Sequence, residues 1–203
     1  MGDHLRFAGR PESEQRAELE RIIRSSPLLM EVLEGLRADR LPDSLLVAGA
    51  IYNLVWNRLT GRPDLNGIND IDVFYFDAAD LSYEAEDRVI QRLGTRFAHL
   101  PLPVQIRNQA RVHLWFPQKF GMPFEPLRSS GEMLGRYASK THAVAARLED
   151  DDSLTFVAPF GLDEIFSFRV TPNRVLDNRR AHDAKGARAK AVWPEITVLP
   201  WEN

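Results

Sequence analysis

The chain has 203 residues, of which 44% are hydrophobic and 27% charged, the composition of an ordinary globular protein. Its net charge of −3 excludes the strong basic field of a dedicated nucleic-acid-binding protein. The absence of cysteine excludes disulfides, thiolate metal sites and a cysteine nucleophile.

The N-terminal stretch is polar. Its sequence, MGDHLRFAGRPESEQRAELE, lacks the apolar centre of a secretory signal. No run of about 18 apolar residues predicts a membrane span, so we expect a cytoplasmic protein with no membrane partner. Two amphipathic helices are predicted before residue 43, separated at Ser25-Ser26-Pro27. Ser26 would cap the second helix, with Pro27 at its first position.

A strand and a helix are predicted next. The apolar run SLLVAG, 44–49, indicates a buried strand that ends in Gly49. AIYNLVWNRLTG, 50–61, has apolar residues at helical spacing, and Gly61 would end that helix. The turn-forming residues of GRPDLNGIN then predict a loop.

Two aspartates open the following strand, which lies in LNGINDIDVFYFD, 65–77. Alternate residues of a strand share a face, so Asp70 and Asp72 should point the same way. Carboxylates that lie close together repel, and each raises the pKa of the other. Either the pair lies in solvent as a strand cap, or a cation lies between its members. Asp77, on the opposite face, is predicted to be a turn residue.

The segment 103–116 alternates between apolar and polar residues, after a predicted helix from about Tyr83 to Phe97. We expect a strand or hairpin with one wet face. The apolar face would carry Ile106, Ala110, Val112, Leu114 and Phe116, and the wet face would carry Gln105, Arg107, Gln109, Arg111 and His113.

The C-terminal part mixes helices and strands. A helix is predicted first, then a strand around 142–148, a hairpin with the acidic turn EDDD, and a short helix in GLDEIFSFRVTPN. A basic tail with Lys185 and Arg188 follows, and we favour a solvated helix for it over a contact with substrate. The whole chain is predicted to be one domain with segments 1–43, 44–126 and 127–203.

The order of these elements indicates phosphate chemistry. A glycine turn at Gly49 followed by a helix start presents free N–H groups and a positive dipole end, which suit phosphate. A carboxylate pair on the neighbouring strand suits Mg²⁺, which favours one or two carboxylates together with substrate phosphates. The alternative without any ligand is a tight turn at Gly49 next to two solvated carboxylates.

The motifs VAGAIYNLVWNRLTGRP, GINDIDVFYFD and RNQARVHLWF resemble a bacterial family of uncharacterised nucleotidyltransferases within the DNA polymerase beta-like superfamily. APFGLDEIFSFRVTPN and WPEITVLPW are similar to the same family's C-terminal half, so the resemblance extends from about Leu45 to Trp201. It implies an α+β fold, with a small mixed β-sheet core flanked by helices and a C-terminal α+β extension. The implied activity is Mg²⁺-dependent (or Mn²⁺-dependent) transfer of a nucleoside monophosphate from an NTP to an acceptor.

The resemblance also implies site residues. Asp70 and Asp72 match the metal-binding pair, and Gly49 matches the phosphate-binding turn. Ala50 stands where the superfamily usually has Gly or Ser, which leaves only its backbone N–H for phosphate. Gln105 stands where a third acid is expected, and an amide carries no charge and cannot act as a base.

Two arginines, Arg107 and Arg111, are candidates for phosphate binding because the guanidinium fork suits phosphate. Arg62 fits a phosphate contact and a surface role equally well. For His113 we favour a solvated face of the sheet. The main hypothesis is a nucleotidyltransferase with an unidentified acceptor. The alternatives are a catalytically impaired nucleotide-binding sensor or partner module, because of Gln105, and a plain protein-interaction domain.

Overall fold

The structure is a computed structural model that describes residues 3–202. Its helices are α1 (Glu12–Arg24), α2 (Pro27–Asp39), α3 (Gly49–Thr60), α4 (Tyr83–Arg96), α5 (Val112–Phe120), α6 (Asp163–Phe166) and α7 (Arg179–Val192). Its strands are β1 (Leu45–Val47), β2 (Ile71–Tyr75), β3 (Val104–Asn108), β4 (Ala145–Leu148), β5 (Leu154–Val157), β6 (Arg169–Val170) and β7 (Thr197–Val198). Short 3₁₀ helices span Asp3–Leu5, Gln109–Arg111, Gly131–Arg136 and Lys140–His142.

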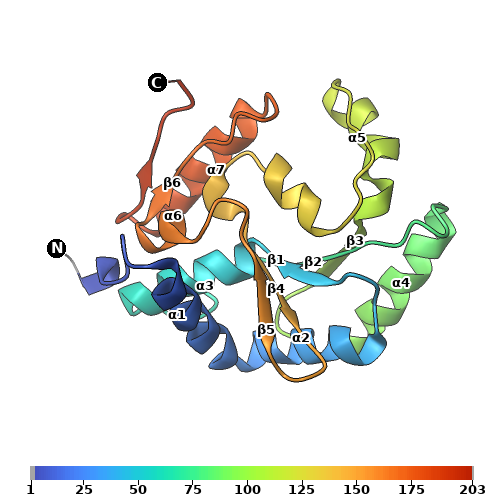
Figure 1. Ribbon diagram of the computed structural model, residues 1–203, viewed down its shortest axis with the longest axis horizontal. Helices are drawn as coiled ribbons and strands as arrows, with labels where there is room; N and C mark the ends of the chain where they lie inside the picture. Colours follow the sequence, from blue (N-terminus) through green and yellow to red (C-terminus); the bar gives the residue numbers. More distant parts are fainter. Residues whose placement is uncertain (1–2, 203) are drawn as a thin grey trace.

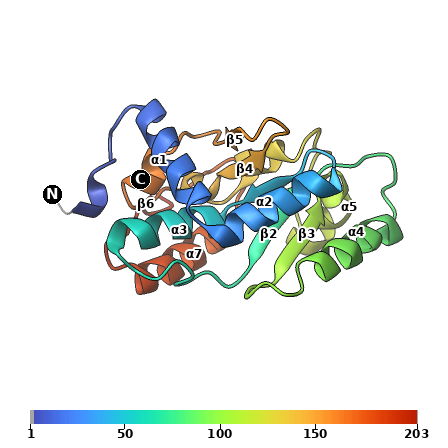
Figure 2. The same ribbon diagram turned by 90° about the horizontal axis from the view of Figure 1, so that it is seen from below.

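Five strands form one mixed sheet in the order β3-β2-β1-β4-β5. Only β2 and β3 run parallel in it, and the other neighbours are antiparallel. Strands β6 and β7 form a separate parallel pair. In Figure 1, α2 and α4 lie below the large sheet, whereas α5 and α7 rise above it; Figure 2 shows α2 crossing the sheet from below. The expected α+β fold with a mixed sheet flanked by helices is confirmed.

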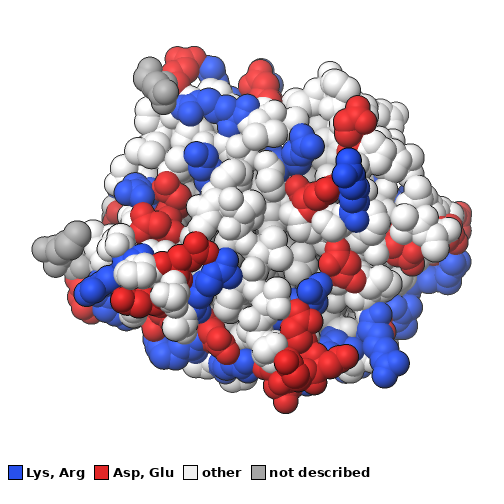
Figure 3. All heavy atoms as spheres, viewed as in Figure 1, with Lys and Arg blue, Asp and Glu red and all other residues white. Residues whose placement is uncertain are grey.

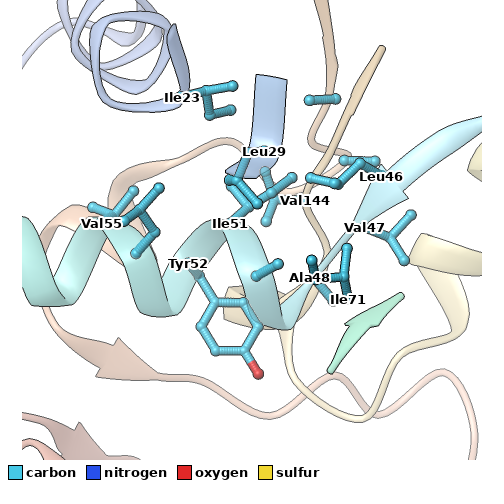
Figure 4. Packing of buried hydrophobic residues seen from close by; sticks show 14 of the residues in the cluster. Ile23, Leu29, Leu46, Val47, Ala48, Ile51, Tyr52, Val55, Ile71 and Val144 are labelled. Carbon is cyan, nitrogen blue, oxygen red and sulfur yellow. The ribbon is translucent and has the colours of Figure 1, made fainter. Parts of the chain in front are cut away.

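Helix α3 packs against strands β1 and β2 and also against the N-terminal helix α1. Figure 4 shows Ile51 and Val55 pointing from α3 toward Leu29 and Ile23, all of them buried. The Tyr52 side chain points away on the other side of the helix. One hydrophobic core of buried residues extends from the first helices to the last turns of the chain. Its packing fixes the start of α3 relative to β1 and β2, where the candidate site lies.

Several local predictions are confirmed. Pro27 begins α2, and the Ser26 hydroxyl accepts a hydrogen bond from the N–H of Leu29. Gly61 ends α3 with a left-handed φ of 68°. The acidic turn 149–153 joins β4 and β5 as expected. Among residues 3–202, none of the helices has both the length and the apolar character needed to cross a lipid bilayer.

The long strand predicted over 103–116 is wrong beyond Asn108. Strand β3 ends there because the Asn108 side chain turns the backbone: its Oδ1 accepts from the N–H of Ala110 and of Asp77. A 3₁₀ turn and helix α5 follow. Apolar residues at every second position also contain i, i+4 pairs such as Val112 and Phe116, so the pattern fits a helix as well. Consequently Gln109, Arg111 and His113 do not share a strand face with Gln105.

Candidate functional site

The two aspartates lie at the start of β2, an interior strand of the sheet between β3 and β1. Ile71 and Val73 are fully buried, while Asp72 lies between them on the opposite face and is half-buried. Asp72 is paired in register with Val47 of β1 and with Gln105 of β3. Asp70 directly precedes the strand and is also half-buried. The alternation of the strand therefore brings the carboxylates together, as the sequence indicates.

Gln105 completes this group from the neighbouring strand. Its Nε2 donates a hydrogen bond to Oδ2 of Asp70 over 2.7 Å. Arg107 lies two residues further along β3, opposite Phe74, and therefore shares the face of Gln105. The structure thus brings together Asp70, Asp72, Gln105 and Arg107, four of the residues selected from the sequence.

Asp72 has a raised pKa. Its burial is the main cause, the negative charge of Asp70 adds to it, and the positive charges of Lys185 and Arg107 oppose it. Lys185 comes from α7, far away in the sequence. It is exposed to water, yet many protein atoms surround it: desolvation lowers its pKa, and Asp72 and Asp70 act in the opposite direction. A cation beside the pair is therefore favourable, and the chain supplies part of that charge itself.

Replacing Asp72 by asparagine is expected to stabilise the protein without divalent ions, and more so at higher pH. Because the folded pKa of Asp72 lies above its ordinary value, ionisation favours the unfolded chain. The free energy of unfolding of the wild type therefore decreases, relative to that of the variant, as pH rises from the ordinary pKa of aspartate through the raised pKa of Asp72. Urea unfolding with a chelator present, at about pH 4 and about pH 7, measures the difference. An equal or larger gain at the lower pH would contradict this prediction.

The turn before α3 presents free backbone donors. The N–H groups of Ile51 and Tyr52 donate to the carbonyl of Ala48, so α3 has its first hydrogen bonds there. Within residues 3–202 the N–H groups of Gly49 and Ala50 have no acceptor, as expected for the first turn of a helix. This end of α3 also carries the positive end of the helix dipole.

The tight bend itself lies one residue earlier than predicted. Ala48, with φ 54° and ψ −112°, adopts the unusual backbone conformation, whereas Gly49 is the first helical residue. A β-carbon at Gly49 would meet only the Oη of Tyr52 and the Nδ2 of Asn53, each 3.9 Å away. A β-carbon would therefore fit there in ordinary contact with these two polar atoms, so space alone does not require glycine at this position.

Buried and partly buried aromatic residues that the sequence analysis missed lie near the start of α3. The Tyr52 ring stacks on His142 with centroids 4.8 Å apart. Burial raises the pKa of Tyr52 and of Tyr137, and the charge of Asp72 adds to both. Burial lowers the pKa of His142, helped by the charge of Lys185. These residues hold no charge at neutral pH, and the charge of Asp72 acts on both tyrosines.

The remaining candidates lie elsewhere. The Arg111 guanidinium binds the carbonyl of Leu81 and the carboxylate of Glu86, so it does not join the acid pair. Arg62 forms a bidentate ion pair with the carboxylate of Glu195. Asp77 accepts a hydrogen bond from the N–H of Ala79, in keeping with a turn residue.

The tryptophans divide into two groups. Trp56 and Trp193 are buried in the core, whereas Trp115 is 38% exposed on α5 and Trp201 is half-buried. Trp115 borders a cleft of about 880 Å³ between α5 and α7. Tyr137, His142 and Lys185 line the same cleft, and Lys185 is one of the charges that act on Asp72.

The donor atoms fit a hard divalent cation. No group of three or more acidic, histidine or cysteine side chains converges within the described residues. Two carboxylates on one face with an amide beside them are nevertheless a suitable donor set for Mg²⁺, whose remaining ligands are usually water and substrate phosphates. Burial and the charge of Asp70 raise the pKa of Asp72, and a cation at this position would oppose both effects.

A family model described as "Nucleotidyltransferase" matches residues 34–198. No curated protein matches the sequence. A solved structure described as revealing "a CCA-adding enzyme head domain" has the same fold, with a TM-score of 0.75 and 24% sequence identity. The match covers 94% of this chain and 98% of that one.

Proposed function

The chain belongs to the nucleotidyltransferase family, and from this premise we propose that it moves a nucleoside monophosphate from an NTP to an acceptor hydroxyl, with Mg²⁺ or Mn²⁺ as cofactor. The observation that carries the proposal is the meeting of Asp70, Asp72 and Gln105 on adjacent strands. The sheet that bears them also leads through β1 into the free N–H groups at the start of α3. An anion site beside a cation site suits a metal-bound triphosphate.

Each residue has a distinct part in this proposal. Asp70 and Asp72 would hold the divalent ion, and the amide oxygen of Gln105 can join them if the side chain turns away from its present bond to Asp70. The bound ion would neutralise charge on the phosphates and orient them for an in-line displacement. The N–H groups of Gly49 and Ala50 would bind phosphate oxygens from the other side.

Cationic side chains support the same substrate. Lys185 and Arg107 both act on the charge of Asp72, so a triphosphate bound next to the pair would lie near both. Because Arg111 is engaged with Glu86, it has no part in the proposed site. Oriented cations of this kind stabilise the charge that develops during phosphoryl and nucleotidyl transfer.

The proposed reaction is a displacement at the α-phosphorus of the NTP. The acceptor oxygen forms a bond to that phosphorus, the bond to the bridging oxygen breaks, and pyrophosphate leaves with the electron pair. The hydroxyl proton passes to solvent, because Gln105 cannot accept it. Solvent thus takes the place of the third acid, which the resemblance leads one to expect at position 105 as the proton acceptor.

Incubation of the protein with each α-labelled NTP, a divalent ion and a cell extract tests the proposal. Label transferred to an acceptor by the wild type, and not by the Asp70→Asn/Asp72→Asn variant, would support it. Nucleotide binding without any transfer would instead support a sensor or partner module, which the amide at position 105 favours. A protein that binds neither nucleotide nor metal would refute both and leave an interaction domain.

Replacing Gln105 by glutamate is expected to raise the transfer rate, by roughly 100-fold if proton removal limits it. The new carboxylate would supply a base and a third charged ligand on the face of the acid pair. The rate of pyrophosphate release measures the effect. Gln118→Glu, which adds an acid at an exposed position of α5, is the matched control and should leave the rate unchanged. A Gln105→Glu rate no higher than that of wild type would mean that the missing acid does not limit the reaction.

A further inference from the structure

The cleft between α5 and α7 combines apolar walls with positive charge. Its apolar lining includes Trp115, Phe120, Met122 and Met133. Trp115 is 38% and Phe120 50% exposed, which is unusual for side chains of this size. An exposed apolar surface that is concave rather than scattered is typical of a binding site.

The charges along the cleft are almost all of one sign. Asp177 is the one acid among its lining residues, against Lys119, Arg136, Arg179, Arg180 and Lys185. Arg179 pairs with Glu202. Within residues 3–202, neither Arg136 nor Arg180 has a carboxylate partner, whereas most of the chain's arginines do, as in the pair Arg92–Asp39.

The cleft also leads to the proposed reaction centre. Lys185 lines it and acts on the charges of Asp72 and Asp70. Tyr137, which shares the lining, lies close enough to Asp72 for that charge to raise its pKa. A molecule bound in the cleft beside Lys185 and Tyr137 would therefore have one end near the charge of Asp72.

We propose that this cleft binds the acceptor of the transfer, and that the acceptor is a small molecule with a flat apolar body and a carboxylate or phosphate group. The proposal rests on the function proposed above. The apolar body would lie against Trp115 and Phe120, while Arg136 and Arg180 would bind the anionic group. The acceptor hydroxyl would then point toward Lys185, where its oxygen attacks the α-phosphorus and pyrophosphate departs.

The size and charge of the surface favour a small molecule over a nucleic-acid end. A volume of about 880 Å³ lies within the range of sites that enclose one small ligand. On the face shown in Figure 3, acidic and basic side chains are interspersed and form no continuous basic band. With a net charge of −3, the chain lacks the extended field that binds a phosphate backbone.

Two fluorescent probes test the ligand class. The first, 8-anilinonaphthalene-1-sulfonate, carries a flat apolar body with an anionic group; the second, N-phenyl-1-naphthylamine, has the same body without the charge. Wild type should bind the anionic probe more tightly. The Arg136→Gln/Arg180→Gln variant should have a roughly tenfold lower affinity for the anionic probe and an unchanged affinity for the neutral probe. Trp115→Ala should weaken both.

The matched control is Arg10→Gln/Arg128→Gln, which removes two exposed arginines outside the cleft and should change neither affinity. Saturating ATP with Mg²⁺ should not displace the anionic probe from the wild type. The inference is overturned if the cleft variant binds both probes like wild type, if ATP displaces the probe competitively, or if a mixed-sequence single-stranded oligonucleotide displaces it better than small aromatic carboxylates do. Failure of the wild type to bind ATP would refute the proposed function alone, because the probe comparison does not depend on nucleotide.

Discussion

Replacing Asp70 and Asp72 together by asparagine is expected to abolish Mg²⁺-dependent NTP binding. Asparagine keeps the shape of each side chain and removes its charge, so the loss reports on the carboxylates themselves. A contact to a charged group contributes about 1.5–3 kcal/mol, and losing two corresponds to a decrease in affinity of roughly 100-fold or more. Calorimetric titration of ATP at fixed Mg²⁺ measures the effect.

The control for this experiment is Asp77→Asn. Asp77 follows the same strand at its far end, where its carboxylate binds the N–H of Ala79, and an asparagine oxygen can keep that bond. The control should bind ATP like wild type. The double variant should also remain folded, because it loses a repulsion that raises the pKa of Asp72. If it bound ATP as tightly as wild type does, the site assignment would be wrong.

Replacing Lys185 by methionine is expected to weaken ATP binding by roughly tenfold, the second largest effect we foresee on the nucleotide site. Methionine retains the apolar length of the side chain and removes the cation that acts on both Asp70 and Asp72. Lys185→Arg, which keeps a positive charge, should recover most of the affinity. Arg88→Met removes an exposed cation from α4 and serves as the control.

The pH dependence of binding separates an electrostatic role of Lys185 from a structural one. Lys185 lowers the pKa of Asp72, so its removal raises that pKa further. Mg²⁺ requires the ionised carboxylate, and affinity therefore falls as pH drops through the pKa of Asp72. In Lys185→Met this fall should begin at a higher pH than in wild type. Equal pH profiles with reduced affinity would indicate that Lys185 acts through packing alone.

The site and the cleft divide the chain's functional surface between two proposed ligands. The acid pair and the start of α3 lie on the sheet, where β1, β2 and β3 fix their relative positions. The cleft is lined by α5, by the region of α7 and by residues between 133 and 142, all from later segments of the chain. Helices α5 and α7 flank the sheet (Figure 1). A scaffold that holds the nucleotide while separate helices hold the acceptor would let the acceptor differ between relatives without altering the transfer site.

Local sequence patterns determined the elements that position the acids. Alternation along β2 placed Asp70 and Asp72 on one face, because successive side chains of a strand point in opposite directions. The helix caps at Ser26 and Gly61 were readable for the same reason, since each depends on hydrogen bonds or backbone angles within a few residues. The helical spacing in 50–61 likewise placed the start of α3 directly after β1.

Only the tertiary structure decided what surrounds those acids. Lys185 lies more than a hundred residues after Asp72, and no local pattern distinguishes it from the other cations of a helix expected to be solvated. The end of β3 depended on side-chain bonds from Asn108 to the backbone of Asp77, a contact between distant segments. Periodicity records the preference of each segment for one buried face, whereas the positions of charges and clefts depend on how those faces pack together.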